Sequence, residues 1–152
     1  MPDQTERLRS ATHLFLRSFG VLDAARTPCG QPLALSEAHA LLHLLDCKAE
    51  RAAPTVTELA RVLCIDKSNA TRLCQRMLRS GHLTLRPCPQ DGRAKRISLT
   101  AKGTRLARSV SESSRKRFQT LLSGIPRKKR AQVLESLHLL NESLLGCTLP
   151  TP

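Results

Sequence analysis

The sequence has 152 residues, of which 40% are hydrophobic and only 2% aromatic, with neither Trp nor Tyr. This composition disfavours a disordered chain and single-strand nucleic-acid binding by base stacking, and it suits one domain of helices packed around an aliphatic core. The net charge of +13 indicates a polyanionic partner.

The positive charge lies beyond the first third of the chain. Residues 1–54 carry six basic and six acidic side chains, whereas residues 55–104 carry ten and three and residues 105–152 carry nine and three. No apolar stretch reaches the ~18 residues of a membrane span, and the N-terminus lacks the apolar core of a signal peptide. We therefore expect a cytoplasmic protein with no membrane partner.

Catalytic and metal-binding motifs are missing from the sequence. It contains none of the motifs GxSxG, HExxH, GxxxxGK[ST] or GxGxxG, and its six cysteines include no CxxC pair. We expect no enzyme activity, no cofactor and no resident metal. Cys47 and Cys74 lie on apolar helix faces, whereas Cys29, Cys88 and Cys147 lie in loops or near the C-terminus and should be more exposed.

The first half of the chain reads as helices. Apolar residues spaced three and four apart predict a helix over 4–25, and a Pro- and Gly-containing loop follows. Ser36 is the expected N-cap of a second, largely apolar helix. After Pro54, a capping box formed by Thr55 and Glu58 starts a short helix.

The second half begins with another helix and a hairpin. Asp66 is a strong N-cap for a helix that Gly81 ends, which completes a helix-turn-helix pattern. Alternating residues at 82–86 and 96–99 predict a β-hairpin with a polar tip. Thr100 caps a long helix that runs to about residue 123, and Pro126 is placed at the first position of a last helix. The outer helices carry apolar stripes, which self-association about a two-fold axis would bury.

One face of the helix after Asp66 carries the side-chain types that are typical of a DNA-recognition helix. Arg and Lys neutralise phosphates, while Arg, Asn and Gln recognise base edges in the major groove. A solvated surface is the alternative interpretation of such a face. We call this set the polar face: Lys67, Ser68, Asn69, Thr71, Arg72, Gln75, Arg76 and Arg79.

The hairpin tip adds a second cluster of cations. Arg93, Lys95 and Arg96 lie there, and Asp91 is expected to bond the Arg93 guanidinium and point it outward, as suits a narrow minor groove. A surface ion pair without function is the alternative.

Residues 55–105 closely resemble the winged helix-turn-helix of the MarR family of bacterial transcription regulators. The most specific part is the wing, DGRAKRISLTAKG, with the family's Asp-x-Arg at Asp91 and Arg93, and residues 34–45 resemble the family's second helix. The resemblance implies a mainly α fold with a small β-hairpin wing. In one departure from the family, Cys64 stands in the turn where Gly is common, so a left-handed backbone there would be strained.

The resemblance also implies how the molecule works. A single domain, 1–152, would hold a winged helix-turn-helix lobe at 34–100 and dimerisation helices at 1–26 and 101–148. A homodimer would place its two recognition helices in successive major grooves of a pseudo-palindromic double-stranded operator. It would repress genes until a small ligand, an oxidant or a metal releases it.

The sequence offers more than one candidate for the signal that releases the repressor. An organic ligand is expected near His13, Arg17 and His43, and oxidation would act on an exposed thiol such as Cys29 or Cys88. A zinc-responsive regulator is an alternative, because His39 and His43 are four residues apart on one helix face and Cys29 precedes them. A protein-interaction module without DNA binding is a further alternative, although it would have no need of a cationic wing.

Overall fold

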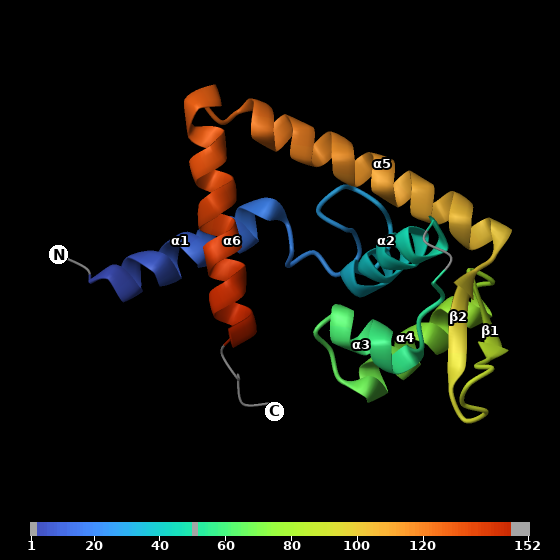
Figure 1. Ribbon diagram of the computed structural model, residues 1–152. Coiled ribbons are helices and arrows are strands. Elements are labelled where there is room, and N and C mark those ends of the chain that lie inside the picture. Colours follow the sequence, from blue (N-terminus) through green and yellow to red (C-terminus); the bar gives the residue numbers. More distant parts are fainter. Residues whose placement is uncertain (1–2, 50–51, 147–152) are drawn as a thin grey trace. The chain divides into compact units, whose positions relative to one another are not determined.

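The computed structural model describes residues 3–49 and 52–146. They form two compact units, one ending at Ser114 and one starting at Arg115. The first unit contains helices α1 (Gln4–Phe19), α2 (Leu35–Ala49), α3 (Val56–Val62) and α4 (Lys67–Arg79), strands β1 (Leu83–Pro87) and β2 (Lys95–Leu99), and the start of α5 (Ala101–Ser123) (Figure 1). The fold is therefore mainly α with one hairpin, as predicted.

The second unit holds the end of α5, a 3₁₀ turn η1 (Arg127–Lys129) and helix α6 (Arg130–Gly146). The sequence interpretation was wrong about where this last helix begins. Pro126 precedes the 3₁₀ turn, and α6 starts only at Arg130, because the basic run closes a single tight turn first. No helix in the ranges 3–49 and 52–146 is both long and apolar enough to cross a membrane.

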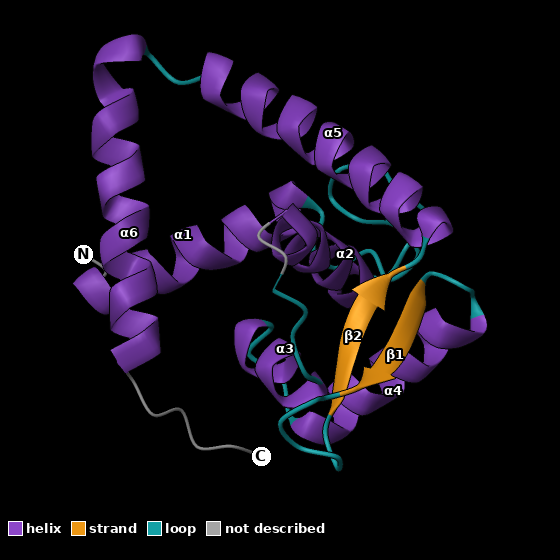
Figure 2. Cartoon of the chain, turned by 45° about the vertical axis from the view of Figure 1, so that its right-hand side comes forward, coloured by secondary structure: helices purple, strands orange, loops and turns teal. Residues whose placement is uncertain are grey.

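The core of the first unit is aliphatic. Side chains from α2, α3, α4, both strands and α5 pack together, as the composition predicts. Those with no more than 2% of their surface exposed include Leu41, Leu44, Leu59, Leu73, Met77, Ile97, Ala107 and Val110. Helices α3 and α4 form the helix-turn-helix, and Figure 2 shows the hairpin beside α4.

The hairpin, which we call the wing, is a two-stranded antiparallel sheet. Its register pairs Leu83 with Leu99, Thr84 with Ser98 and Arg86 with Arg96, so Leu83, Ile97 and Leu99 enter the core. A bridge from Thr55 to Arg96 and a 2.8 Å bond from the Ile97 N–H to the Pro54 carbonyl fix the wing to the start of α3. The sequence pattern had not indicated this third strand-like segment.

Helix boundaries follow the predicted caps in α3, α4 and α5 but not in the first two helices. The Gly103 N–H donates to the Thr100 hydroxyl at 3.0 Å, which confirms that cap. Helix α1 ends at Phe19 rather than at residue 25, because Gly20 adopts a left-handed conformation with φ of 90°. Helix α2 begins before Ser36, because the Ala34 carbonyl already accepts the Glu37 and Ala38 N–H groups.

Candidate nucleic-acid interface

Helix α4 is held by one face and exposed on the other. The Asp66 carboxylate caps it by accepting the Asn69 N–H at 2.8 Å, and this bond lowers the pKa of Asp66. Ala70, Leu73, Cys74 and Met77 are buried. All eight residues of the polar face are exposed, so the predicted division of the helix is confirmed.

Within the polar face, three side chains are partly occupied by the helix itself. Arg72 donates to Asn69 at 2.8 Å, Asn69 donates to Asp66, and the Thr71 hydroxyl donates to the Lys67 carbonyl at 2.8 Å. In the described part of the chain, the remaining side chains make no hydrogen bond or ion pair. These are Lys67, Ser68, Gln75, Arg76 and Arg79. They present charged and amide donors to any partner that approaches this face.

The wing tip, residues 88–94, is closed by its own backbone. Asp91 accepts the Arg93 N–H through its side chain at 2.9 Å and the Ala94 N–H through its carbonyl at 3.0 Å, and the Cys88 N–H donates to Ala94 at 2.9 Å. Asp91 therefore shapes the turn and does not hold the Arg93 guanidinium, contrary to the sequence interpretation. Arg93 and Lys95 are exposed.

Arg96 behaves differently from its two basic neighbours. Its guanidinium donates to the Ala53 carbonyl at 2.6 Å and to the Gln90 side chain at 3.2 Å, and the residue is only half-exposed. Arg96 thus links the wing to the loop before α3. This contact joins residues 43 positions apart, which explains why the sequence pattern could not reveal it.

A cavity of about 510 Å³ lies where the start of α3, the start of α4 and the wing meet. Three cations, Lys67, Arg93 and Lys95, line it, and among the described residues Asp91 is the one acidic member of the lining. Hydroxyls of Thr55, Thr57 and Thr71 also line it, and of these the sequence analysis placed only Thr71 in the interface. The arrangement joins the polar face to the wing in one cationic surface that can accept phosphates.

The residues predicted to bind an effector differ in how exposed they are. His13, Arg17 and His39 are exposed, and Cys29 and His43 are half-buried. No hydrogen bond joins any two of the six predicted residues. Within residues 3–49 and 52–146, no group of three or more His, Cys, Asp or Glu is arranged to hold a metal ion.

The cysteines differ from expectation at one position. Cys88 is buried, at 7% exposed, because it pairs with Ala94 across the base of the wing tip and its thiol faces Gln90. Hydrogen bonds from the Gln90 and Asp91 backbone and from Arg96 lower its pKa, whereas burial raises the pKa of Cys74. Cys147 lies outside the described residues. Cys64, which stands in the turn where Gly is common in the family, has a left-handed backbone with φ of 53°.

A family model and several solved structures match this chain. A model of the MarR family matches residues 32–94. The solved MepR–DNA complex of S. aureus matches with a TM-score of 0.70 at 19% identity, over 95% of this chain and 99% of that one. A MarR transcriptional regulator from Methanosarcina mazei matches with a TM-score of 0.69 at 19% identity, over 92% and 98%.

A third solved protein shares the fold with a lower TM-score. The haem sensor protein PefR from Streptococcus agalactiae, in complex with haem, matches with a TM-score of 0.56 at 20% identity, over 94% of this chain and 95% of that one. At these identities the solved structures establish only the fold. The family model matches the helix-turn-helix and most of the wing. The chain therefore has the winged helix-turn-helix fold, and its residues 32–94 match the model of the MarR family.

Proposed function

We propose that this chain is a cytoplasmic, sequence-specific DNA-binding repressor rather than an enzyme. The observation that carries the proposal is the polar face of α4: eight exposed side chains with DNA-reading chemistry on a helix whose other face is buried in the core. MepR, which shares the fold, was solved bound to DNA. The neighbouring wing supplies the exposed cations Arg93 and Lys95.

Different parts of this surface have different roles in the proposal. Gln75, Arg76 and Asn69 read base edges in the major groove, since Arg suits guanine and Gln or Asn suits adenine. Lys67, Arg72 and Arg79 contact phosphates, which position the helix without reading sequence. Arg93 and Lys95 of the wing lie along the minor groove, and Arg96 holds the wing in place.

The working unit is a homodimer that binds a pseudo-palindromic operator. Helices within the predicted dimerisation segments, 1–26 and 101–148, expose large apolar side chains, which monomeric proteins seldom leave in contiguous patches. They include Leu14 and Phe15 on α1, Phe118 and Leu121 on α5, and Leu134, Leu140 and Leu144 on α6. A second copy of the chain would bury them, and residues 34–100 would form the DNA-binding lobe of the single domain.

A chemical signal releases the repressor in this proposal. PefR, with the same fold, is a haem sensor, so the fold accommodates a ligand-dependent switch. For this chain we propose a small organic ligand or oxidation of a cysteine, with His13, Arg17, Cys29, His39, His43 and Cys88 as the candidate positions. The zinc-responsive and interaction-only alternatives have no observation that favours them over this one.

A selection experiment tests the DNA-binding proposal. Duplexes enriched from a random pool should contain an inverted repeat, with half-site centres about 10 base pairs apart. Arg93→Ala should weaken binding to the selected duplex by about 1–3 kcal/mol, measured by fluorescence anisotropy. Arg76→Ala should reduce the preference for that duplex over random DNA.

A control variant and an independent measurement of the oligomeric state complete the test. Arg108→Ala removes an exposed cation of α5 outside the lobe and should leave the affinity nearly unchanged. Sedimentation velocity should show a dimer at micromolar concentration. Failure to enrich any sequence, or full binding by Arg93→Ala, would contradict the proposal.

A further inference from the structure

A run of four cations lies at the bend between α5 and α6, outside the polar face and the wing. It occupies the turn η1 and the first position of α6, at the bend that Figure 1 shows between the two helices. Arg127, Lys128 and Lys129 are exposed, and Arg130 is half-buried. We call these four residues the basic corner. It belongs to the second compact unit, whereas α4 and the wing belong to the first.

The charge of the basic corner is not compensated by carboxylates. Residues 113–134 contain seven basic and no acidic side chains. Lys129 donates to the side-chain oxygen of Gln132 at 3.2 Å and Arg130 donates to the Ile125 carbonyl at 3.0 Å, and both acceptors are neutral. In the described part of the chain, the side chains of Arg127 and Lys128 make no hydrogen bond or ion pair. The positive charge of the corner therefore faces solvent.

The stability of α6 does not explain this run of cations. Cations at the N-terminus of a helix oppose the helix dipole, whose positive end lies there. Among the described residues of η1 and α6, neither a side-chain cap nor an acidic residue in the first turn offsets them. Arg130 holds the turn through its bond to Ile125, but Arg127 and Lys128 have no such structural contact within the described residues. Their charge is available to a partner.

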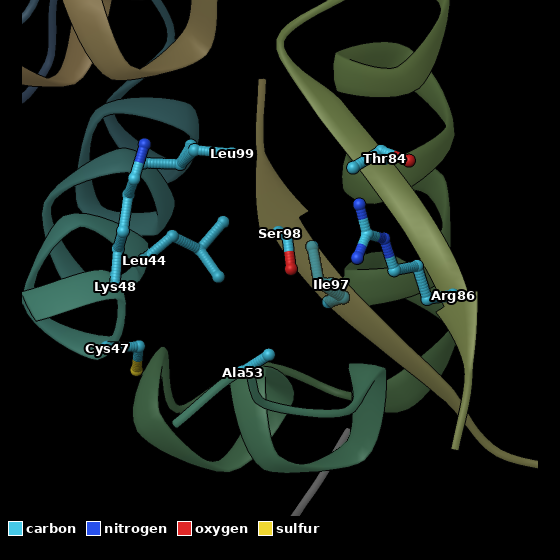
Figure 3. Close-up of a pocket in the computed structure, with 9 residues that line it drawn as sticks. All are labelled: Leu44, Cys47, Lys48, Ala53, Thr84, Arg86, Ile97, Ser98 and Leu99. Carbon is cyan, nitrogen blue, oxygen red and sulfur yellow. The ribbon is translucent and has the colours of Figure 1, made fainter. Parts of the chain in front are cut away.

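A pair of cations elsewhere in the chain shows how the basic corner differs. Lys48 of α2 and Arg86 of β1 border a cavity of about 290 Å³ between α2 and the wing, as Figure 3 shows. Lys48 already donates to the Thr104 hydroxyl at 2.8 Å. A cavity of this volume is too small for the backbone of a polymer. The basic corner instead presents consecutive, exposed cations that a polymer backbone can follow.

The chemistry of the basic corner favours a polyanion over two other occupants. A second copy of the chain carries the same cations, and like charges that face each other across an interface repel. Surfaces that insert into membranes combine cations with exposed aromatic or large apolar side chains. Residues 124–132 contain no aromatic residue, and their one large apolar side chain, Ile125, is half-buried. Duplex DNA, with one phosphate charge per ~1.7 Å of its axis, matches the charge density of the corner.

We propose that the basic corner is a second, sequence-independent contact with the phosphate backbone of duplex DNA. Arg127 and Lys128 bind phosphates directly, and Lys129 adds a further contact, because its ammonium group has three N–H donors and uses one on Gln132. The choice of DNA as the polyanion rests on the proposed repressor function, since a chain held on DNA by α4 meets a high local concentration of phosphates. A dimer on its operator would then also contact DNA of any sequence.

Fluorescence anisotropy with a random duplex of ~60 base pairs tests the proposal on the full chain. The double variant Arg127→Gln/Lys128→Gln should bind this duplex at least ~10-fold more weakly at ~0.1 M salt. The plot of log affinity against log salt should become less steep by ~1.8, the effect of two lost phosphate contacts. The matched control Arg26→Gln/Arg108→Gln removes the same charge from exposed positions outside the corner and should keep both the affinity and the slope.

Lysine acetylation, read by peptide mass spectrometry, gives a second readout on the unaltered chain. The bound random duplex should protect Lys128 and Lys129 if the basic corner contacts DNA, and Lys67 and Lys95 if α4 and the wing do. Failure of this proposal and failure of the proposed repressor function are therefore seen at different lysines.

The proposal is overturned if the double variant binds the random duplex as the unaltered chain does, if the control loses as much affinity, or if Lys128 and Lys129 are not protected. Unchanged DNA affinity together with lost binding to vesicles of phosphatidylglycerol and phosphatidylcholine would overturn it in favour of a membrane surface.

Discussion

At Gly103, α5 passes close to the turn after α4, and a single methyl group there should destabilise the fold. A Cβ atom at Gly103 would lie 2.0 Å from the His82 carbonyl oxygen and 2.9 Å from its carbonyl carbon. Both are backbone atoms, and the oxygen accepts the Thr100 N–H at 3.0 Å. The backbone therefore cannot move away without weakening the hydrogen bond that ties Thr100, the residue before α5, to His82.

The magnitude follows from three opposing effects. Replacing Gly by Ala inside a helix ordinarily stabilises it by about 0.5–1 kcal/mol. At Gly103, overpacking costs about 1–3 kcal/mol, and loss of the Thr100 bond costs about 0.5–1.5 kcal/mol. We expect Gly103→Ala to lower the free energy of unfolding by about 0.5–4 kcal/mol, which reverses the usual sign.

Urea denaturation followed by far-ultraviolet circular dichroism measures this effect, because the chain has no Trp or Tyr to serve as a fluorescent probe. Gly92→Ala is the matched control, since a Cβ there meets no atom within 4 Å. Its free energy of unfolding should change far less. Equal or greater stability of Gly103→Ala would refute the close approach of α5 to His82.

Three further outcomes are expected. The Thr55 N–H and the Thr55 hydroxyl donate to the Glu58 carboxylate at 2.7 and 3.1 Å and lower the pKa of Glu58 below 4.5, so their stabilisation is present above that pH and is lost as the pH falls through the lowered value. Thr55→Ala should therefore cost about 0.5–2 kcal/mol at neutral pH and less near pH 3, by chemical denaturation at both; an equal cost would argue against this pair. Cys64→Gly should raise the free energy of unfolding by up to about 1 kcal/mol by relieving the left-handed backbone, and a lower melting temperature would argue against strain there. Affinity for the selected duplex should fall steeply from ~50 to 200 mM salt, whereas a flat profile would exclude phosphate contacts as its main source.

Features set by neighbouring residues could be predicted from the sequence. The Asp66 cap, the buried and exposed faces of α4 and the Thr55–Glu58 capping box all depend on residues within a few positions of one another. The same logic located the wing strands to within a residue. It misplaced the end of α1, where the apolar spacing continues past Gly20 although the left-handed glycine stops the helix.

Features set by distant residues could not be predicted in this way. The bond of Arg96 to Ala53 turns an expected DNA contact into a support for the wing, and the pairing of Cys88 with Ala94 buries a thiol that a polar loop would expose. The cavity beside Arg86 likewise exists only because α2 packs against the wing. No periodicity or spacing in the sequence indicates such contacts between residues that are distant along the chain.

Helix α4 keeps its stabilising residues and its outward-facing residues on opposite sides. Its buried residues, such as Leu73 and Met77, are separate from positions such as Ser68, Gln75 and Arg76, whose side chains bond to nothing in the described chain. Substitutions at the outward positions therefore carry little folding penalty. This independence makes the helix a natural target for combinatorial mutagenesis: a library randomised at Ser68, Gln75 and Arg76 should retain its thermal stability while its members diverge in the duplexes they prefer.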